Sequence, residues 1–165
     1  MELNIGAVQK LASPAPFGLV SVRTPEGRTN LMALSWWMFA SNHPPMLAVA
    51  LSKKGLSGEL IEKNKEFGLS LVDESLKEAA FACGTCSGRK VDKAAQFGIE
   101  LKAPEIIKTP LVAESKAALE CRLVSVTDAS DHNLFLAEIV AAHCREELNQ
   151  LYAWDGYKRL DSIKK

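Results

Sequence analysis

Two apolar segments separated by consecutive prolines constrain the fold of this chain more than any other feature. Residues 31–39 are apolar at nearly every position, residues 46–51 form a second apolar run, and Pro44 and Pro45 stand between them. Each proline lacks an N–H group and fixes its own φ angle, so a β-ladder cannot continue through this point. Both runs have the residue types of strands. The sequence therefore predicts two paired strands joined by a turn.

A polar loop follows the second predicted strand and leads into a helix. Residues 52–57, SKKGLS, form the loop, and Leu56, Leu60 and Ile61 then fall on one helical face. Ser57 stands where an N-cap residue is expected. Hydroxyl groups, ammonium groups and free helix N–H donors would gather here, which suits a phosphate or another anion. An ordinary capped helix with solvated lysines remains the alternative.

Composition and charge exclude several classes of function. Twenty Lys and Arg residues balance twenty Asp and Glu residues, and no basic block suggests a nucleic-acid surface. The first residues lack the pattern of a secretion signal, and no apolar run is long and uncharged enough to cross a bilayer. We therefore expect a cytoplasmic protein that forms one domain over residues 1–165 and binds neither nucleic acid nor membrane.

Cys83 and Cys86 form a C-x-x-C motif, which occurs in redox-active dithiols and in halves of zinc sites. The second half of a zinc site is missing, because Cys121 and Cys144 are far apart in the sequence. No metal site is predicted. A dithiol remains open, beside a loop of small residues that lets the backbone approach a ligand.

The remaining sequence predicts a mainly β protein with inserted helices. Apolar runs predict four further strands, at residues 17–23, 66–72, 117–126 and 134–143. Helices are predicted after Asp73 and at residues 91–97, where Gly98 closes the second one. Residues from Leu151 onward show no period and are predicted to be irregular. Strands and helices do not alternate, which favours a mostly antiparallel barrel or sandwich over a parallel sheet.

Two motifs resemble one known family. Residues 30–36 (NLMALSW), the Pro44-Pro45-Met46 turn and the 52–57 loop resemble the flavin reductase-like family, and within it the flavoredoxin-type branch. Residues 83–93, CGTCSGRKVDK, are similar to the C-G-x-x-S-G-R-x-x-D-K segment of the same branch, to which Cys86 is an addition. The resemblance implies a split β-barrel that binds FMN.

Position in these motifs also implies which residues contact the flavin. They are Asn30, Met32, Ala33, Leu34, Ser35 and Trp36 around the ring, Ser52, Lys53, Lys54 and Ser57 at the phosphate, and Ser87, Arg89, Lys93 and His132 as further polar contacts. Arg89 and Lys93 would share a helical face if a helix began near Ser87. Read without the resemblance, Trp36 would pack in a core and Lys93 would be solvated. Ala33 stands where relatives often carry Thr, which removes one hydroxyl from the edge of the flavin.

The resemblance implies an FMN-dependent oxidoreductase that acts as a homodimer. NAD(P)H or a reduced carrier would be the donor, and a flavin, a metal or a protein would be the acceptor. No Ser-His-Asp order or pair of carboxylates points to hydrolysis, and no catalytic residue is assigned. Two alternatives remain open, namely a flavin-storage module without turnover and a thiol-redox protein that uses Cys83 and Cys86.

Overall fold

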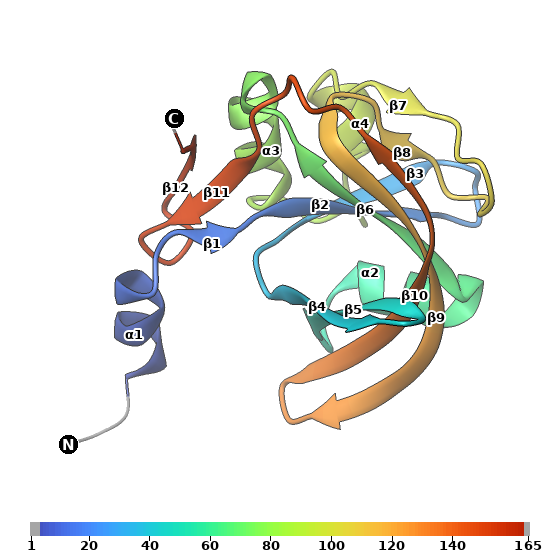
Figure 1. Cartoon of the computed structure of the whole chain (residues 1–165), viewed down its shortest axis with the longest axis horizontal. Coiled ribbons are helices and arrows are strands. Elements are labelled where there is room, and N and C mark those ends of the chain that lie inside the picture. Colours follow the sequence, from blue (N-terminus) through green and yellow to red (C-terminus); the bar gives the residue numbers. More distant parts are fainter. Residues whose placement is uncertain (1–3, 164–165) are drawn as a thin grey trace.

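The computed structural model describes residues 4–163, which form a mostly antiparallel β structure with a few short helices (Figure 1). The helices are α1 (Ile5–Leu11), α2 (Leu56–Asn64), the 3-10 helix η1 (Glu74–Leu76), α3 (Lys77–Cys83) and α4 (Lys93–Gln96). The strands are β1 (Ala15–Pro16), β2 (Gly18–Arg23), β3 (Thr29–Leu34), β4 (Trp37–Asn42), β5 (Pro45–Ser52), β6 (Glu66–Val72), β7 (Leu101–Lys102), β8 (Leu111–Val112), β9 (Ser115–Ala129), β10 (His132–Cys144), β11 (Leu151–Trp154) and β12 (Arg159–Ser162). None of the helices in this part of the chain has the length and apolar character needed to span a membrane.

Seven strands form one antiparallel sheet in the order β3-β2-β6-β9-β10-β5-β4. Strands β3 and β4 follow one another in the chain, yet they lie at opposite edges of this sheet, and only Ser35 and Trp36 connect them. Two residues span a short distance, so the sheet must curl until its edges come close together. The result is a split β-barrel, which confirms the predicted fold class (Figure 1).

The prediction of one continuous strand over residues 31–39 is wrong. Leu34, the last residue of β3, pairs with Gly18 of β2, whereas Trp37, the first residue of β4, pairs with Val49 of β5. An apolar run shows that a strand is buried but not which neighbour it pairs with, so the change of sheet edge was not visible in the sequence. The predicted pairing with residues 46–51 is confirmed for β4 alone.

Two clusters of buried side chains lie on opposite faces of β2. Val20 and Val22 point into the barrel and pack with Phe67 of β6. Leu19 points to the other face, where it joins a second cluster that includes Leu160 of β12. Side chains alternate along a strand, so a strand that is covered on both faces must be apolar at nearly every position. This requirement explains why β2 carries Leu19, Val20 and Val22, with the small Ser21 as the polar residue buried among them.

The prediction that the tail is irregular is also wrong. Strands β11 and β12 form a hairpin, and β11 pairs in turn with β1. Leu151 and Ala153 are buried while Tyr152 and Trp154 are partly exposed, so β11 has the alternation of a half-buried strand. Four residues are too few for this period to stand out in the sequence. The hairpin matters because its turn carries Tyr157 toward the barrel.

Other sequence predictions agree with the structure. Strand β6 spans the predicted residues 66–72, and β9 and β10 are longer versions of the two late strands. The Asp73 carboxylate accepts a hydrogen bond from the N–H group of Ser75 at 3.0 Å, which confirms Asp73 as a cap. Gly98 follows α4 with a φ of +64°, the left-handed conformation expected of a residue that ends a helix.

Two carboxylates hold the loop at residues 105–109 against the barrel. Glu120 is fully buried on β9, and it accepts hydrogen bonds from the N–H groups of Glu105, Ile106 and Ile107 at 2.6 to 2.8 Å. The Nε2 atom of His143 lies 2.7 Å from the same carboxylate. Glu66 accepts from the next two N–H groups of the loop. These contacts satisfy backbone donors that a loop without secondary structure would otherwise leave unpaired.

Candidate functional site

A cleft of about 310 Å³ lies beside the connection between β3 and β4, at the place where the two edges of the sheet meet. Its walls are formed by Met32, Ala33, Leu34, Ser35, Trp36, Ala50, Leu51, Ser52, Gly84, His132 and Tyr157. Seven of these residues are among the predicted flavin contacts, namely Met32 to Trp36, Ser52 and His132. The cleft therefore gathers half of the predicted site around one concave surface.

One wall of the cleft is aromatic. The rings of Trp36 and His132 have their centroids 4.9 Å apart with 37° between their planes. The carbonyl of Trp36 accepts a hydrogen bond of 2.9 Å from the N–H group of Ala50, which fixes the β3–β4 connection against β5. Asp131 lies 2.8 Å from Nδ1 of His132, and this contact lowers the pKa of the carboxyl. Trp36 is 46% exposed, so part of its indole faces solvent instead of the core.

Tyr157 also lines the cleft, and sequence reasoning missed it. Its ring stacks on Phe81 with centroids 5.8 Å apart, and burial raises the pKa of its hydroxyl. A Cβ atom on Gly84 would lie 2.4 Å from the Tyr157 hydroxyl, so this close approach requires glycine. The hydroxyl is buried and has no hydrogen-bond partner among residues 4–163. The Asp155-Gly156 pair directly before Tyr157 is typical of a turn, and it is the sequence signal that could have revealed this hairpin.

Asn30 of β3 and Ser57 of α2 are in contact. The side-chain amide of Asn30 donates a hydrogen bond of 2.9 Å to the Ser57 hydroxyl, and both residues are buried. The Oδ1 atom of Asn30 has no partner within the described part of the chain. It faces Gly88, where a Cβ atom would lie 1.7 Å away. Asn30 thus links β3, α2 and the loop that carries Ser87 and Arg89.

The prediction of Ser57 as an N-cap is wrong. Helix α2 begins at Leu56, and the residue before it is Gly55, which makes no side-chain capping hydrogen bond. Ser57 lies inside the first turn with its hydroxyl turned toward Asn30. The sequence misplaced the boundary by two residues, which is a common error at helix ends. Because Gly55 has no side chain to cap the helix, the first N–H groups of α2 lack a side-chain acceptor.

The lysines of the 52–57 loop do not converge on one point. The ammonium group of Lys53 pairs with the Asp128 carboxylate of the β9–β10 hairpin, and its backbone N–H group donates to the Asp131 carbonyl at 3.1 Å. Lys54 is exposed, and its N–H group lies 3.4 Å from the Ser52 hydroxyl. The loop is thereby tied to the hairpin, while Lys54 stays free to reach an anion.

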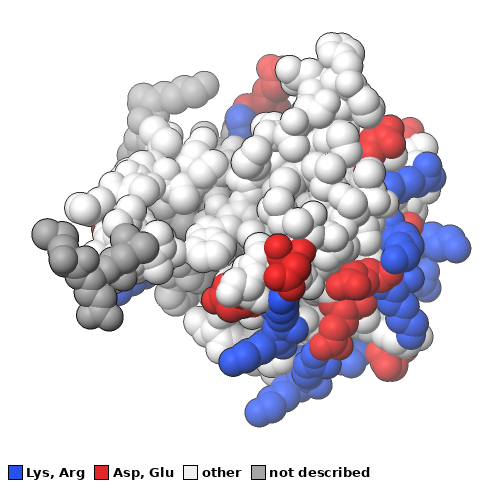
Figure 2. All heavy atoms as spheres, turned by 90° about the horizontal axis from the view of Figure 1, so that it is seen from below, with Lys and Arg blue, Asp and Glu red and all other residues white. Residues whose placement is uncertain are grey.

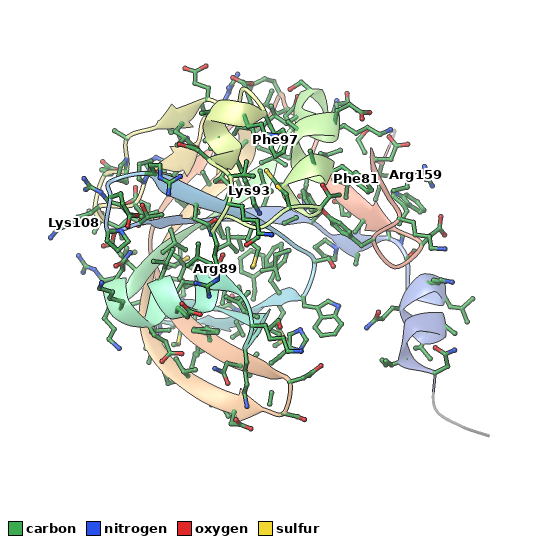
Figure 3. All side chains as sticks on the ribbon, turned by 180° about the vertical axis from the view of Figure 1, so that it is seen from behind. Phe81, Arg89, Lys93, Phe97, Lys108 and Arg159 are labelled. Atoms are coloured by element: carbon green, nitrogen blue, oxygen red, sulfur yellow. The ribbon has the colours of Figure 1, made fainter. Side chains whose placement is uncertain are left out.

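Arg89 and Lys93 do not share a helical face, because α4 begins only at Lys93. Arg89 lies beside α2, where its guanidinium pairs with Glu59 (Figure 3). It lines a second cleft, of about 430 Å³, together with Gly88 and Leu56. The hydroxyl of Ser87 lies 3.3 Å from the Arg89 N–H group and stabilises the turn between them. The predicted basic pair is therefore divided between two places.

Lys93 is buried, with 4% of its surface exposed. Its Nζ atom donates a hydrogen bond of 2.6 Å to the carbonyl oxygen of Cys83. No carboxylate of residues 4–163 pairs with it, and burial lowers its pKa. Figure 3 shows Lys93 in the interior of the molecule. A buried ammonium without a counter-charge is costly, and its presence favours an anionic ligand.

Metal ligation has no support in this region. Among residues 4–163, no group of three or more His, Cys, Asp or Glu side chains is placed to hold a metal ion. Trp37 is partly buried against the barrel cluster. The site is thus an open cleft lined in part by aromatic side chains, and the Tyr157 hydroxyl on its lining is unpaired within residues 4–163.

Comparison with known proteins identifies the family. The model of the flavin reductase like domain matches residues 11–161. The NADH-dependent flavin reductase StyB of Pseudomonas fluorescens is 31% identical over 124 residues, which cover 74% of this chain and 68% of StyB. Three further relatives, from Aeropyrum pernix, Escherichia coli and Archaeoglobus fulgidus, are 31–34% identical, and the match spans 61–64% of their length.

Solved structures agree with this assignment. Flavoredoxin from Methanosarcina acetivorans superposes with a TM-score of 0.87 at 26% identity, covering 100% of this chain and 91% of the other. An FMN-binding protein from Thermus thermophilus, solved with bound 1-cyclohex-2-enone, superposes with a TM-score of 0.83 at 26% identity, covering 93% and 88%. This chain belongs to the flavin reductase-like family.

Proposed function

We propose that the chain binds FMN with the isoalloxazine ring in the 310 Å³ cleft and passes electrons through it. The observation that carries this proposal is the convergence of residues 32–36, Ser52 and His132 on one cleft. Its volume falls at the lower end of the range of small-molecule sites, which suits a flat ring whose tail lies outside. The aromatic wall of Trp36 and His132 offers a stacking surface.

Buried polar groups without partners are a second argument for a bound ligand, one that supplies hydrogen-bond donors and acceptors. Asn30 Oδ1 and the Tyr157 hydroxyl are buried without partners among residues 4–163. Lys93 is a buried cation without a carboxylate. Buried polar groups in folded proteins are nearly always hydrogen-bonded, so the two unpaired groups, together with a buried cation that lacks a counter-charge, suggest partners supplied by a cofactor. The carbonyl and ring nitrogen atoms of a flavin are groups of this kind.

The start of α2 is the proposed place for the phosphate. Its first N–H groups have no side-chain cap, and a helix N-terminus attracts negative charge. Ser52 and Lys54 stand directly before this turn and provide a hydroxyl and an exposed ammonium group. A helix start of this kind is a common site for a phosphate group, which suits the terminal phosphate of FMN.

Turnover is favoured over storage because the cleft is open. Trp36 remains 46% exposed, which leaves space for a second molecule beside the ring. Bound FMN would supply the redox chemistry, since it accepts a hydride and returns electrons singly or in pairs. The name of StyB supports NADH as the donor, with NADPH or a reduced carrier as further candidates. We expect a flavin, a metal or a protein as acceptor.

An anaerobic reduction experiment tests turnover. NADH or NADPH should bleach the flavin absorbance of the loaded protein, and added free flavin, ferric chelate or dioxygen should restore it. A protein that binds FMN but is reduced by none of these donors, nor by a low-potential chemical reductant, would instead be a storage module.

We also propose that the protein works as a homodimer. Met38 and Phe39 on the edge strand β4 are 60% and 62% exposed, and Val124, Val126 and Leu134 of the β9–β10 hairpin are exposed as well. Figure 2 shows a broad uncharged area on one face, with the Lys, Arg, Asp and Glu side chains gathered to one side of it. Exposed apolar side chains on an unpaired strand edge are typical of an interface.

The four free cysteines fit a reducing compartment such as the cytoplasm.

A further inference from the structure

Cys83 and Cys86 lie on one side of a tight turn at the end of α3. The N–H groups of Gly84 and Thr85 donate to the carbonyls three residues earlier, both at 3.0 Å, so the helix ends as a 3-10 turn. In such a turn, side chains three residues apart lie one above the other. The Cys86 sulfur lies 3.6 Å from the carbonyl oxygen of Ala82, so it turns back toward the end of the helix. Both thiols therefore belong to one short turn and stand three residues apart.

The two thiols have different surroundings. Cys83 is 1% exposed, and burial raises its pKa to about 11. Cys86 is only partly buried, so a small oxidant can reach it. The ammonium group of Lys93 donates a hydrogen bond of 2.6 Å to the carbonyl oxygen of Cys83, which places a cation beside this turn. An accessible thiol, a neighbouring buried thiol and a fixed cation form the set that a peroxide-sensitive dithiol requires.

We propose that Cys86 and Cys83 form a dithiol that hydrogen peroxide oxidises to an intramolecular disulfide, with Cys86 attacked first and Cys83 as the resolving thiol. The Cys86 thiolate attacks one peroxide oxygen, the O–O bond breaks, and hydroxide leaves, which yields a sulfenic acid. Hydroxide then takes the Cys83 proton. The Cys83 sulfur attacks the Cys86 sulfur, so that the S–S bond forms and the S–O bond breaks. In total, two thiols and one peroxide give one disulfide and two waters.

The bond requires a small adjustment of the turn. Side chains three residues apart on a helix have Cβ atoms about 5–6 Å apart, whereas a disulfide needs roughly 3.5–4.5 Å. Gly84 and Thr85 between the two cysteines are small residues in an exposed turn, which makes this movement feasible. The same turn carries Gly84 into the cleft wall and presents the Cys83 carbonyl to Lys93. Oxidation therefore acts directly on the wall of the proposed flavin site.

Thiol titration and mass spectrometry of the full chain test this proposal without relying on bound flavin. Treatment with hydrogen peroxide should remove two titratable thiols, and dithiothreitol should restore both. Peptide mapping should place the disulfide between Cys83 and Cys86. Cys144, which is exposed, and Cys121, which is buried, serve as internal controls and should stay reduced.

Single substitutions separate the two roles. Cys83→Ser should leave a sulfenic acid on Cys86 that dimedone traps, while Cys86→Ser should leave Cys83 reduced at the same peroxide concentration. Both variants should retain the circular dichroism spectrum of the wild type. The proposal is overturned if Cys86 oxidises no faster than Cys144, or if the only disulfide found joins two chains through Cys144.

Discussion

The ammonium group of Lys93 donates a hydrogen bond of 2.6 Å to the carbonyl oxygen of Cys83 and has no carboxylate partner among residues 4–163. Arg89, four residues earlier in the same motif, pairs with Glu59 on the surface. The two cations thus differ in what they offer a ligand. Arg89 already has a counter-charge, whereas Lys93 is a buried cation whose charge no carboxylate of residues 4–163 balances.

Lys93→Met should weaken FMN binding more than Arg89→Met does. Loss of one charge-assisted hydrogen bond is worth about 1.5–3 kcal/mol, or very roughly a 10- to 150-fold rise in the Kd of FMN. The apoprotein should be as stable as the wild type or more so, because an unpaired buried charge is removed. Fluorescence titration with FMN and urea unfolding measure the two effects. Equal losses of affinity in the two variants would show that Lys93 has no special role.

Tyr157→Phe should separate binding from stability. The Tyr157 hydroxyl is buried without a partner, so its removal should leave the free energy of unfolding unchanged or slightly raised. If the hydroxyl donates to the flavin, affinity should fall by about 0.5–1.5 kcal/mol, roughly 2- to 10-fold. Tyr152→Phe, outside the cleft, is the control and should change neither quantity. A Tyr157→Phe variant with unchanged affinity would remove this residue from the site.

The Glu120 carboxylate should make the protein sensitive to acid. Its pKa is lowered from 4.5 to about 2, because the hydrogen bonds from the N–H groups of residues 105–107 and from His143 outweigh the effect of burial. The unfolded state therefore binds more protons between these pH values, so stability is lost as the pH falls from about 4.5 to about 2. The loss should be on the order of 3 kcal/mol.

Urea unfolding as a function of pH, in the wild type and in Glu120→Gln, measures this contribution. The Glu120→Gln variant should be less stable at neutral pH, and its free energy of unfolding should change less with pH between about 4.5 and 2. Glu147→Gln, at an exposed position, is the control and should follow the wild type. Identical pH profiles for wild type and Glu120→Gln would contradict the assignment.

Phe39→Asp should convert a dimer into a monomer. The substitution places a charge among the exposed apolar side chains of β4, where a second copy would have to bury it. Ile106→Asp changes a side chain of similar exposure on the 105–109 loop and should leave the assembly intact. Light scattering at micromolar concentration distinguishes the two states. A wild-type protein that is monomeric with FMN bound would disprove the homodimer.

The sequence predicted the strands of the barrel better than their connections. Apolar runs located β2, β6, β9 and β10, because burial on one or both faces leaves a direct mark on composition. The division of residues 31–39 at Ser35 and Trp36 left no such mark, since both halves are equally apolar. The short strand β11 was missed because four residues do not establish a period.

Family motifs located the cleft residues, but they could not specify which partner each polar side chain takes. Residues 32–36, Ser52 and His132, which the motifs predict as flavin contacts, line one cleft. The sequence predicts Ser57 as the N-cap of a helix, whereas in the structure its hydroxyl accepts a hydrogen bond from Asn30, a residue 27 positions earlier. Arg89 and Lys93 were separated by a late helix start, which depends on the loop before it. Tyr157 entered the cleft through a hairpin that the sequence did not reveal.

The most direct test of this account is the identity of the flavin that the protein retains. Protein purified from cells that contain both FMN and FAD should be yellow, and heat denaturation should release FMN in near-equal molar amount to the chain, as measured by chromatography with fluorescence detection. Apoprotein should take up added FMN in preference to FAD. A colourless protein that fails to bind added FMN, or one that releases FAD alone, would contradict the proposal that this cleft is an FMN site.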